Sequence, residues 1–206
     1  NVLFSPSKVF ESLARKRGLG WLVPVAILLL MAVLGSLVVA PKLDVDEAVR
    51  AQMERMEKAR PGMTDADREK IEGMIRGQMK GMTSGNARFL FIGLFVAIPL
   101  FLAPALYHGA AAAFGKATTY MTVVAAYAYV QLVQVVKGIL TLAVAWPRKT
   151  ISVAEVQFLL KSNLGALMNP ETASRPLLTL ATNVDLFEIW ALVLGAIALS
   201  RVTRLT

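Results

Sequence analysis

Four long apolar segments constrain this chain more than any other feature of its sequence. They run from Gly20 to Ala40, from Phe89 to Phe114, from Thr122 to Trp146 and from Leu186 to Ser200. A helix crosses the roughly 30 Å hydrocarbon layer of a bilayer with about 20 apolar residues, and each segment reaches that length alone or with its flanks. Backbone polar groups must be satisfied within the bilayer, so such segments fold as helices. The sequence therefore predicts an all-α, polytopic transmembrane bundle of four spans.

These segments organise residues 1–206 into a single membrane domain. We expect a cytoplasmic amphipathic helix in 1–19 and spans at 20–40, 88–114, 120–146 and 184–201. The first span is expected to be a retained anchor, because its apolar run exceeds the roughly 7 to 15 residues of a signal peptide. Segment 41–87 is charged and methionine-rich, and its helical spacing with a break at Arg60-Pro61-Gly62 predicts a helical hairpin.

The segment 150–168 is too polar for a simple span. It carries Glu155, Lys161 and Asn163 among its apolar residues. We expect an interfacial or re-entrant helix here, or a fifth span if the segment inserts.

The excess basic charge lies beside the predicted spans. Segment 41–87 contains equal numbers of basic and acidic residues, so the net charge of +8 comes from the rest of the chain. Lys and Arg in short loops tend to remain cytoplasmic, which places both termini in the cytoplasm and 41–87 and 147–183 outside. Because the basic residues flank spans, we expect no nucleic-acid partner.

Composition excludes several kinds of chemistry. The chain has no cysteine and a single histidine, so thiol catalysis and thiolate metal sites are ruled out. It carries no HExxH motif, phosphate-binding loop or carboxylate pair within a span, and we expect neither an enzyme nor a cofactor. Six of the nine methionines fall in 41–87. Thioethers bind monovalent copper, but methionines at helical spacing without His or Cys are typical of packing or partner contact, so no metal site is expected.

One face of the third predicted span is polar. Tyr127, Gln131 and Gln134 follow a helical spacing, and Lys137 borders the same stripe. A charge within the bilayer costs about 3 kcal/mol on insertion scales and commonly marks a pathway or a partner. We expect Lys137 to pair with Glu188 at the start of the last span, to snorkel toward the membrane surface, or to line a polar cavity for an ion or small solute.

His108 lies on the second predicted span. A short link makes the second and third spans an antiparallel hairpin, which places His108 and Tyr127 at similar depth. We therefore predict a hydrogen bond between them and assign no reaction to the histidine. The candidate buried network comprises His108, Tyr127, Gln131, Gln134, Lys137 and Glu188.

The N-terminal region combines an apolar face with basic residues. Val9, Phe10 and Leu13 share one helical face, and four basic residues surround them: Lys8, Arg15, Lys16 and Arg17. This pattern is typical of an interfacial helix whose basic residues contact anionic lipid headgroups. The alternative is a positive flank that only fixes the orientation of the first span.

The two ends of the chain resemble a known family. The opening SPSKVFESLARKRGLGWLVP, the closing NVDLFEIWALVLGAIALSRVTRL and the GALMNP stretch from Gly165 to Pro170 resemble bacterial members of the Ypt-interacting-protein (Yip) domain family. The resemblance implies a polytopic helical protein with a cytosolic N-terminus, here in a bacterial cytoplasmic membrane. Eukaryotic relatives are linked to vesicle trafficking and Rab-type GTPases. This chain lacks their acidic DLYGP-like motif, so a GTPase partner is not expected.

The sequence is compatible with two functions. The first is a non-enzymatic membrane scaffold or adaptor that contacts lipids and proteins through its amphipathic pieces. The second is a small-solute or ion permease or channel that uses the polar stripe of the third span. Four spans are few for a transporter, so the second function requires a homo-oligomer, while the first allows a homo-oligomer or other membrane proteins as partners.

Overall fold

The computed structural model of the chain describes residues 6–15, 18–60, 62–83, 87–115, 118–153, 155–169 and 173–204. Four helical segments in it are long and apolar enough to cross a membrane: Leu19–Lys42, Ala87–Ala113, Tyr120–Ala145 and Leu186–Thr203. They coincide with the four predicted spans, and the predicted all-α transmembrane bundle is confirmed. The first segment is α2 (Leu22–Val39) with short 3-10 turns η1 (Leu19–Trp21) and η2 (Ala40–Lys42) at its ends, the second is α5 (Ala87–Ala113), and the last lies within α9 (Leu186–Arg204).

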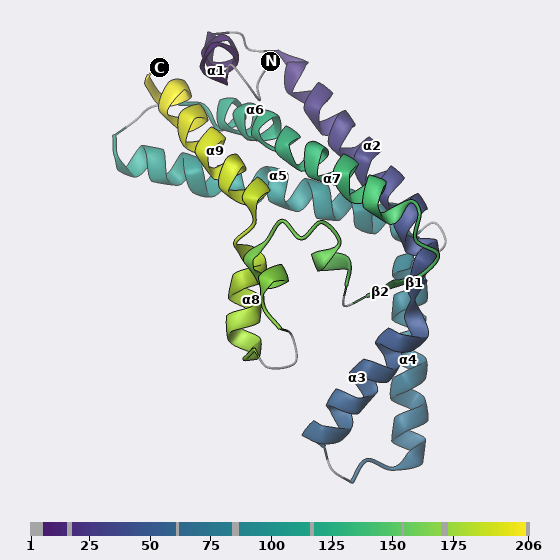
Figure 1. The fold of residues 1–206 in the computed structure, drawn as a ribbon. Helices are drawn as coiled ribbons and strands as arrows, with labels where there is room; N and C mark the ends of the chain where they lie inside the picture. The colour runs from purple at the N-terminus through teal and green to yellow at the C-terminus, as the bar shows by residue number, and fades with distance from the viewer. Residues whose placement is uncertain are drawn as a thin grey trace.

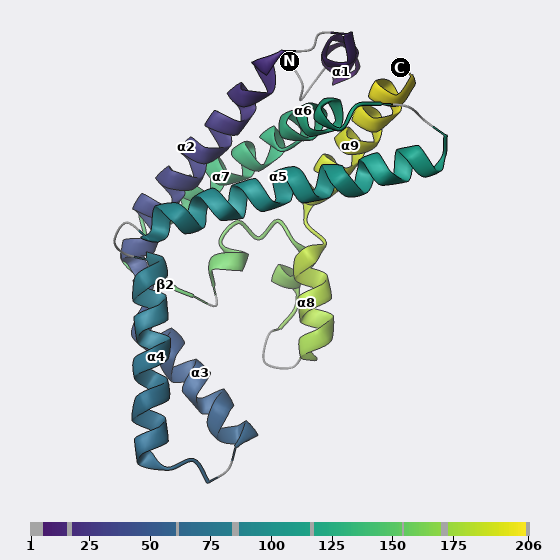
Figure 2. The ribbon, with the colours of Figure 1, turned by 180° about the vertical axis from the view of Figure 1, so that it is seen from behind.

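The third span is divided into two helices at Gln131. Helix α6 (Tyr120–Val130) ends there and α7 (Leu132–Ala145) begins after it, with the Gln134 N–H donating to the Gln131 carbonyl at 2.9 Å. This i to i+3 bond tightens the turn locally. Figures 1 and 2 show α6 between α5 and α9, and α7 running along α2. Helix α6 contacts α5 and α9, and α7 contacts α2 and α9, so the third span contacts all three others.

The main apolar core joins the first and last helices of the chain. Helix α1 (Pro6–Arg15) buries Phe10 completely, and the Arg201 guanidinium lies 3.0 Å from the Glu11 carboxylate. As a result, α1 and the C-terminal end of α9 lie at the same end of the bundle (Figures 1 and 2). The buried residues of this core are Phe10, Ala126, Val130, Val133, Phe187, Ala191, Leu194, Ala198 and Val202.

A helical hairpin projects from the opposite end of the bundle (Figures 1 and 2). Its helices are α3 (Val45–Ala59) and α4 (Asp65–Thr83), and they match the hairpin that the sequence predicts in 41–87. Asp44 caps α3 by accepting a 2.8 Å hydrogen bond from the Glu47 N–H. The hairpin has a core of its own, formed by Val49, Met53 and Ile75. We call α3 and α4 together the hairpin arm.

Two contacts hold the arm's base against the end of the third span. Strand β1 (Leu43–Asp44) pairs in parallel with β2 (Ile151–Ser152). The Lys42 ammonium donates to the carbonyls of Ala145 and Trp146 at 3.0 and 2.7 Å. These carbonyls end α7, where a cation complements the helix dipole.

The sequence predicts an interfacial or re-entrant helix over 150–168, but the described residues of this segment do not form one continuous helix. The described residues of this segment form β2 and two 3-10 turns, η3 (Val156–Phe158) and η4 (Leu164–Leu167). The chain around Asn163 is extended because it pairs antiparallel with Asp185, and the Asn163 side chain caps η4 through the Ala166 N–H. A further helix that the sequence analysis did not predict, α8 (Arg175–Asn183), packs against η4.

Candidate functional site

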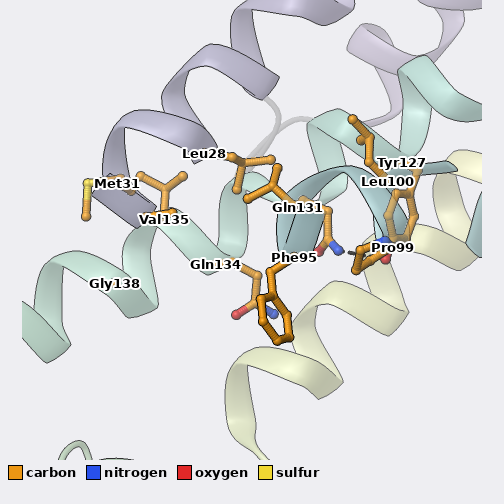
Figure 3. Close-up of a pocket in the computed structure, with 12 residues that line it drawn as sticks. Leu28, Met31, Phe95, Pro99, Leu100, Tyr127, Gln131, Gln134, Val135 and Gly138 are labelled. Atoms are coloured by element: carbon orange, nitrogen blue, oxygen red, sulfur yellow. Dashed lines mark hydrogen bonds between the residues drawn. The ribbon is translucent and has the colours of Figure 1, made fainter. Parts of the chain in front are cut away.

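A cleft of about 310 Å³ lies between the first, second and third spans (Figure 3). Helix α2 and helix α5 form its two apolar walls, and the third span contributes the polar stripe that the sequence predicts. The residues that line it are Leu28, Met31, Ala32, Phe95, Val96, Pro99, Leu100, Tyr127, Gln131, Gln134, Val135 and Gly138.

Three polar side chains of the third span form the floor of the cleft. Gln131 Nε2 donates to the Tyr127 hydroxyl at 2.7 Å, one helical turn away. Gln134 Nε2 donates to the Glu188 carboxylate of α9 at 2.9 Å. Each glutamine therefore engages one of its amide hydrogens with the protein and keeps the rest of its hydrogen-bonding capacity.

A smaller cavity of about 80 Å³ lies on the other side of the Tyr127–Gln131 pair. Glu188 lines it together with Tyr107 of α5 and Gly195 of α9. Tyr127 and Gln131 line both spaces, so this hydrogen-bonded pair forms the wall between the cleft and the smaller cavity.

Lys137 forms an ion pair, but not with the expected residue. Its ammonium lies 3.2 Å from the Asp185 carboxylate, while Glu188 is occupied by Gln134. The prediction of a Lys137–Glu188 pair is therefore wrong. Asp185 precedes α9 on extended backbone, which places its carboxylate within reach of Lys137, whereas Glu188 lies in the first turn of the helix.

Asp185 is the centre of a buried polar cluster at the end of the spans. It is 2% exposed and accepts hydrogen bonds from the Ser162 hydroxyl at 2.5 Å and from the Phe187 N–H at 2.8 Å. Burial alone raises the pKa of this carboxyl, but these two hydrogen bonds and the Lys137 ammonium outweigh it, so the pKa lies below its ordinary value. The cluster fastens the loop around Ser162 to both the third and the last span.

His108 and Tyr127 have partners other than each other, so the predicted hydrogen bond between them is wrong. His108 Nε2 lies 3.1 Å from the Thr118 carbonyl, and its ring packs edge-on against Tyr120. It is Tyr107, the preceding residue, that faces Tyr127, with ring centroids 6.1 Å apart. Successive helical residues differ in direction by about 100°, so His108 does not share the direction of Tyr107, and it is not among the residues that line the cleft.

Lys8 is the predicted headgroup-contacting residue whose side chain the structure describes. Lys8 is exposed on α1, while the side chain of Arg15 and the whole of Lys16 and Arg17 fall outside the described residues. The apolar face of α1 packs on protein, since Phe10 is buried and Val9 and Leu13 contact the main core. Headgroup contact by the basic face of α1 stays a prediction.

Two residues of the polar cluster, Ser162 and Asp185, were not among the candidate residues. The only sequence signal for Asp185 was its position three residues before Glu188, which predicts a helix cap. Ser162 lies in a segment that was expected to be helical. Its contact with Asp185 depends on the antiparallel pairing between Asn163 and Asp185, which a periodic sequence pattern does not predict.

The chemistry available in the cleft is that of neutral hydrogen bonding. Among the described residues that line it, the polar groups are a phenol and two amides. Within the described ranges, no group of three or more His, Asp or Glu side chains is placed to hold a metal ion. The polar groups of the cleft are therefore suited to binding a ligand through hydrogen bonds.

Four spanning helices around an internal polar stripe define a multi-pass helical membrane protein. The family model of the Yip1 domain matches residues 1–206, and the chain belongs to this family. Searches among curated proteins and among solved structures found no significant match. The expected membership of the Yip domain family is thereby confirmed.

Proposed function

We propose that this protein is a non-enzymatic membrane scaffold or adaptor that recruits a protein partner through the hairpin arm. The observation that carries the proposal is the internal structure of the arm. A link between two spans needs only a few residues, whereas α3 and α4 bury Val49, Met53 and Ile75 between them. A hairpin with its own core presents a fixed outer surface.

Charged contacts reinforce the shape of the arm. Arg68 of α4 lies 3.1 Å from Glu57 of α3, and Arg76 of α4 pairs with Asp46 of α3. Met74 is 65% exposed on α4, away from the hairpin core. An exposed methionine is typical of adaptable partner contact.

The orientation that we propose has both termini in the cytoplasm of a bacterium and the hairpin arm outside. The four candidate spans and the contact between Glu11 and Arg201 support an arrangement with α1 and the C-terminal end of α9 on one side. The basic flanks of the spans indicate that this side is cytoplasmic. Lipids with anionic headgroups are then the proposed contacts of Lys8 and the neighbouring basic residues.

Site-specific photo-cross-linking in living cells tests the adaptor function. A photoreactive amino acid at Met74 should give a discrete protein adduct, either with another protein or with a second copy of this chain. The matched controls are the buried Ile75 on the same helix and Leu106, which is 69% exposed on α5. The Met74 adduct should disappear when the exposed neighbours Glu69 and Lys70 exchange charge. An adduct pattern identical at Met74 and Leu106, or unaffected by the exchange, would refute the proposal.

The alternative of an oligomeric permease or channel requires water in the cleft. The chain lacks cysteine, so Gln134→Cys can be probed with an impermeant thiol reagent, with the exposed Ile139→Cys of α7 as the lipid-facing control. Labelling at Gln134→Cys alone would favour transport. Protection at both positions supports the scaffold.

A further inference from the structure

The floor of the cleft has hydrogen-bonding capacity that its protein partners do not use. In the hydrogen bonds of the described residues, Gln131 and Gln134 each donate one amide hydrogen, and Tyr127 accepts one. The Tyr127 O–H, the second N–H of each amide and both amide oxygens remain. Polar groups left unpaired away from water are costly, so an occupant that satisfies them is favoured.

The walls of the cleft select against charged ligands. Leu28, Leu100 and Phe95 are among the lining residues, and no charged side chain lines the cleft in the described part of the chain. A charged ligand would enter a low-dielectric space without a counter-ion. A pure hydrocarbon would leave the floor unpaired. The occupant is therefore neutral and carries at least one hydrogen-bonding group.

The depth of the cleft floor in the bilayer limits further which class of ligand the cleft can bind. Gln131 lies about 17 Å from one end of the third span and about 21 Å from the other, at 1.5 Å per helical residue. This is close to the middle of a hydrocarbon layer about 30 Å thick. The polar groups of a phospholipid lie at the membrane surface and do not reach this depth. A lipid with a small neutral head group on a hydrocarbon tail can place that head group at this depth.

We propose that the cleft binds a neutral membrane lipid of the quinone type, a carbonyl-bearing ring on a long hydrocarbon tail. Its carbonyl accepts hydrogen bonds from the Tyr127 O–H and the free N–H of Gln131. Phe95, which stands beside Gln134 in Figure 3 and is 69% exposed, covers the ring, as aromatic faces favour. The tail leaves between α2 and α5 into the bilayer. This binding is a property beyond the scaffold function and does not depend on it.

Equilibrium binding to the full chain in quinone-free phosphatidylcholine nanodiscs tests the proposal. The probe is a radiolabelled benzoquinone with a ten-carbon tail, and the control probe is a benzene ring with the same tail and no carbonyl. We expect saturable binding of the quinone and about 30-fold weaker binding of the control probe, which lacks both hydrogen bonds that the carbonyl accepts.

Three variants locate the binding in the cleft. Gln131→Leu should raise the Kd of the quinone about tenfold and leave the control probe unaffected. Ala32→Phe fills the cleft from α2 without touching the polar floor and should abolish quinone binding. Gln52→Leu makes the same chemical change on the exposed face of α3 and should have no effect. Equal affinity for the two probes, no saturable quinone binding, or an unchanged Kd in Gln131→Leu and Ala32→Phe would overturn the proposal.

Discussion

The Lys137–Asp185 ion pair should be worth a measurable part of the stability of the bundle. Asp185→Asn retains a side-chain oxygen for the Phe187 N–H and removes the charge that faces Lys137. Breaking a buried pair by removing one partner costs about 3–5 kcal/mol. The Lys137 side chain is 31% exposed, against 3% for Asp185, so solvent partly compensates the charge of the ammonium when its carboxylate partner is removed. We therefore expect a loss of about 2 kcal/mol in the free energy of unfolding.

A double-mutant cycle separates the pair from the other contacts of each residue. Lys137→Met keeps an apolar chain of similar length and leaves Asp185 its hydrogen bonds from Ser162 and Phe187, so about 1 kcal/mol is expected. The double variant should cost about 1 kcal/mol, well below the sum of the single changes. Unfolding in mixed detergent micelles, followed by circular dichroism, gives each value. If the single costs add to within about 0.5 kcal/mol, the two groups do not interact and the reasoning fails.

Three further predictions follow from the contacts described above. The folded pKa of Asp185 lies below the ordinary 3.8, so the ionised carboxylate stabilises the fold fully above that pH. This contribution is lost as the pH falls through the lower folded pKa. The free energy of unfolding, measured from pH 6 to pH 2, should therefore fall less in Asp185→Asn than in the natural chain. Gly165→Ala places a Cβ 2.5 Å from Thr182 Cγ2 and should cost about 2 kcal/mol in the same unfolding assay, whereas an unaltered transition would show that α8 moves freely. Phe10→Ala empties a fully buried site and should cost about 3 kcal/mol, with faster proteolysis within α1, while cleavage as slow as in the exposed control Lys8→Ala would contradict the docking of α1.

The helices and the polar stripe could be predicted because they depend on periodic patterns. Apolar length alone locates the four spans, and the helical period places Tyr127, Gln131 and Gln134 on one face whatever that face contacts. Both predictions need only local geometry. The break at Gln131 is not visible in such a pattern, since the turn keeps the three side chains on the same face.

The partners of the charged residues could not be predicted in the same way. Lys137 had two acidic candidates three residues apart, and the choice between them depends on the extended loop that positions Asp185. For segment 150–168 the sequence predicts an interfacial or re-entrant helix, or a fifth span. In the structure, the Asn163 side chain satisfies the Ala166 N–H, a local bond that competes with helix formation.

The contact between α1 and α9 joins a helix that is synthesised before the four spans to the last of those spans. Five of the buried residues that share the main core with Phe10, from Phe187 to Val202, belong to α9. Until the ribosome has delivered that helix, the apolar face of α1 has no complete site to occupy. Helix α1 can therefore dock completely only after the whole bundle has been assembled. A chain that stops before α9 keeps this face uncovered, which makes it prone to aggregation and gives proteases a means to distinguish it from the finished protein.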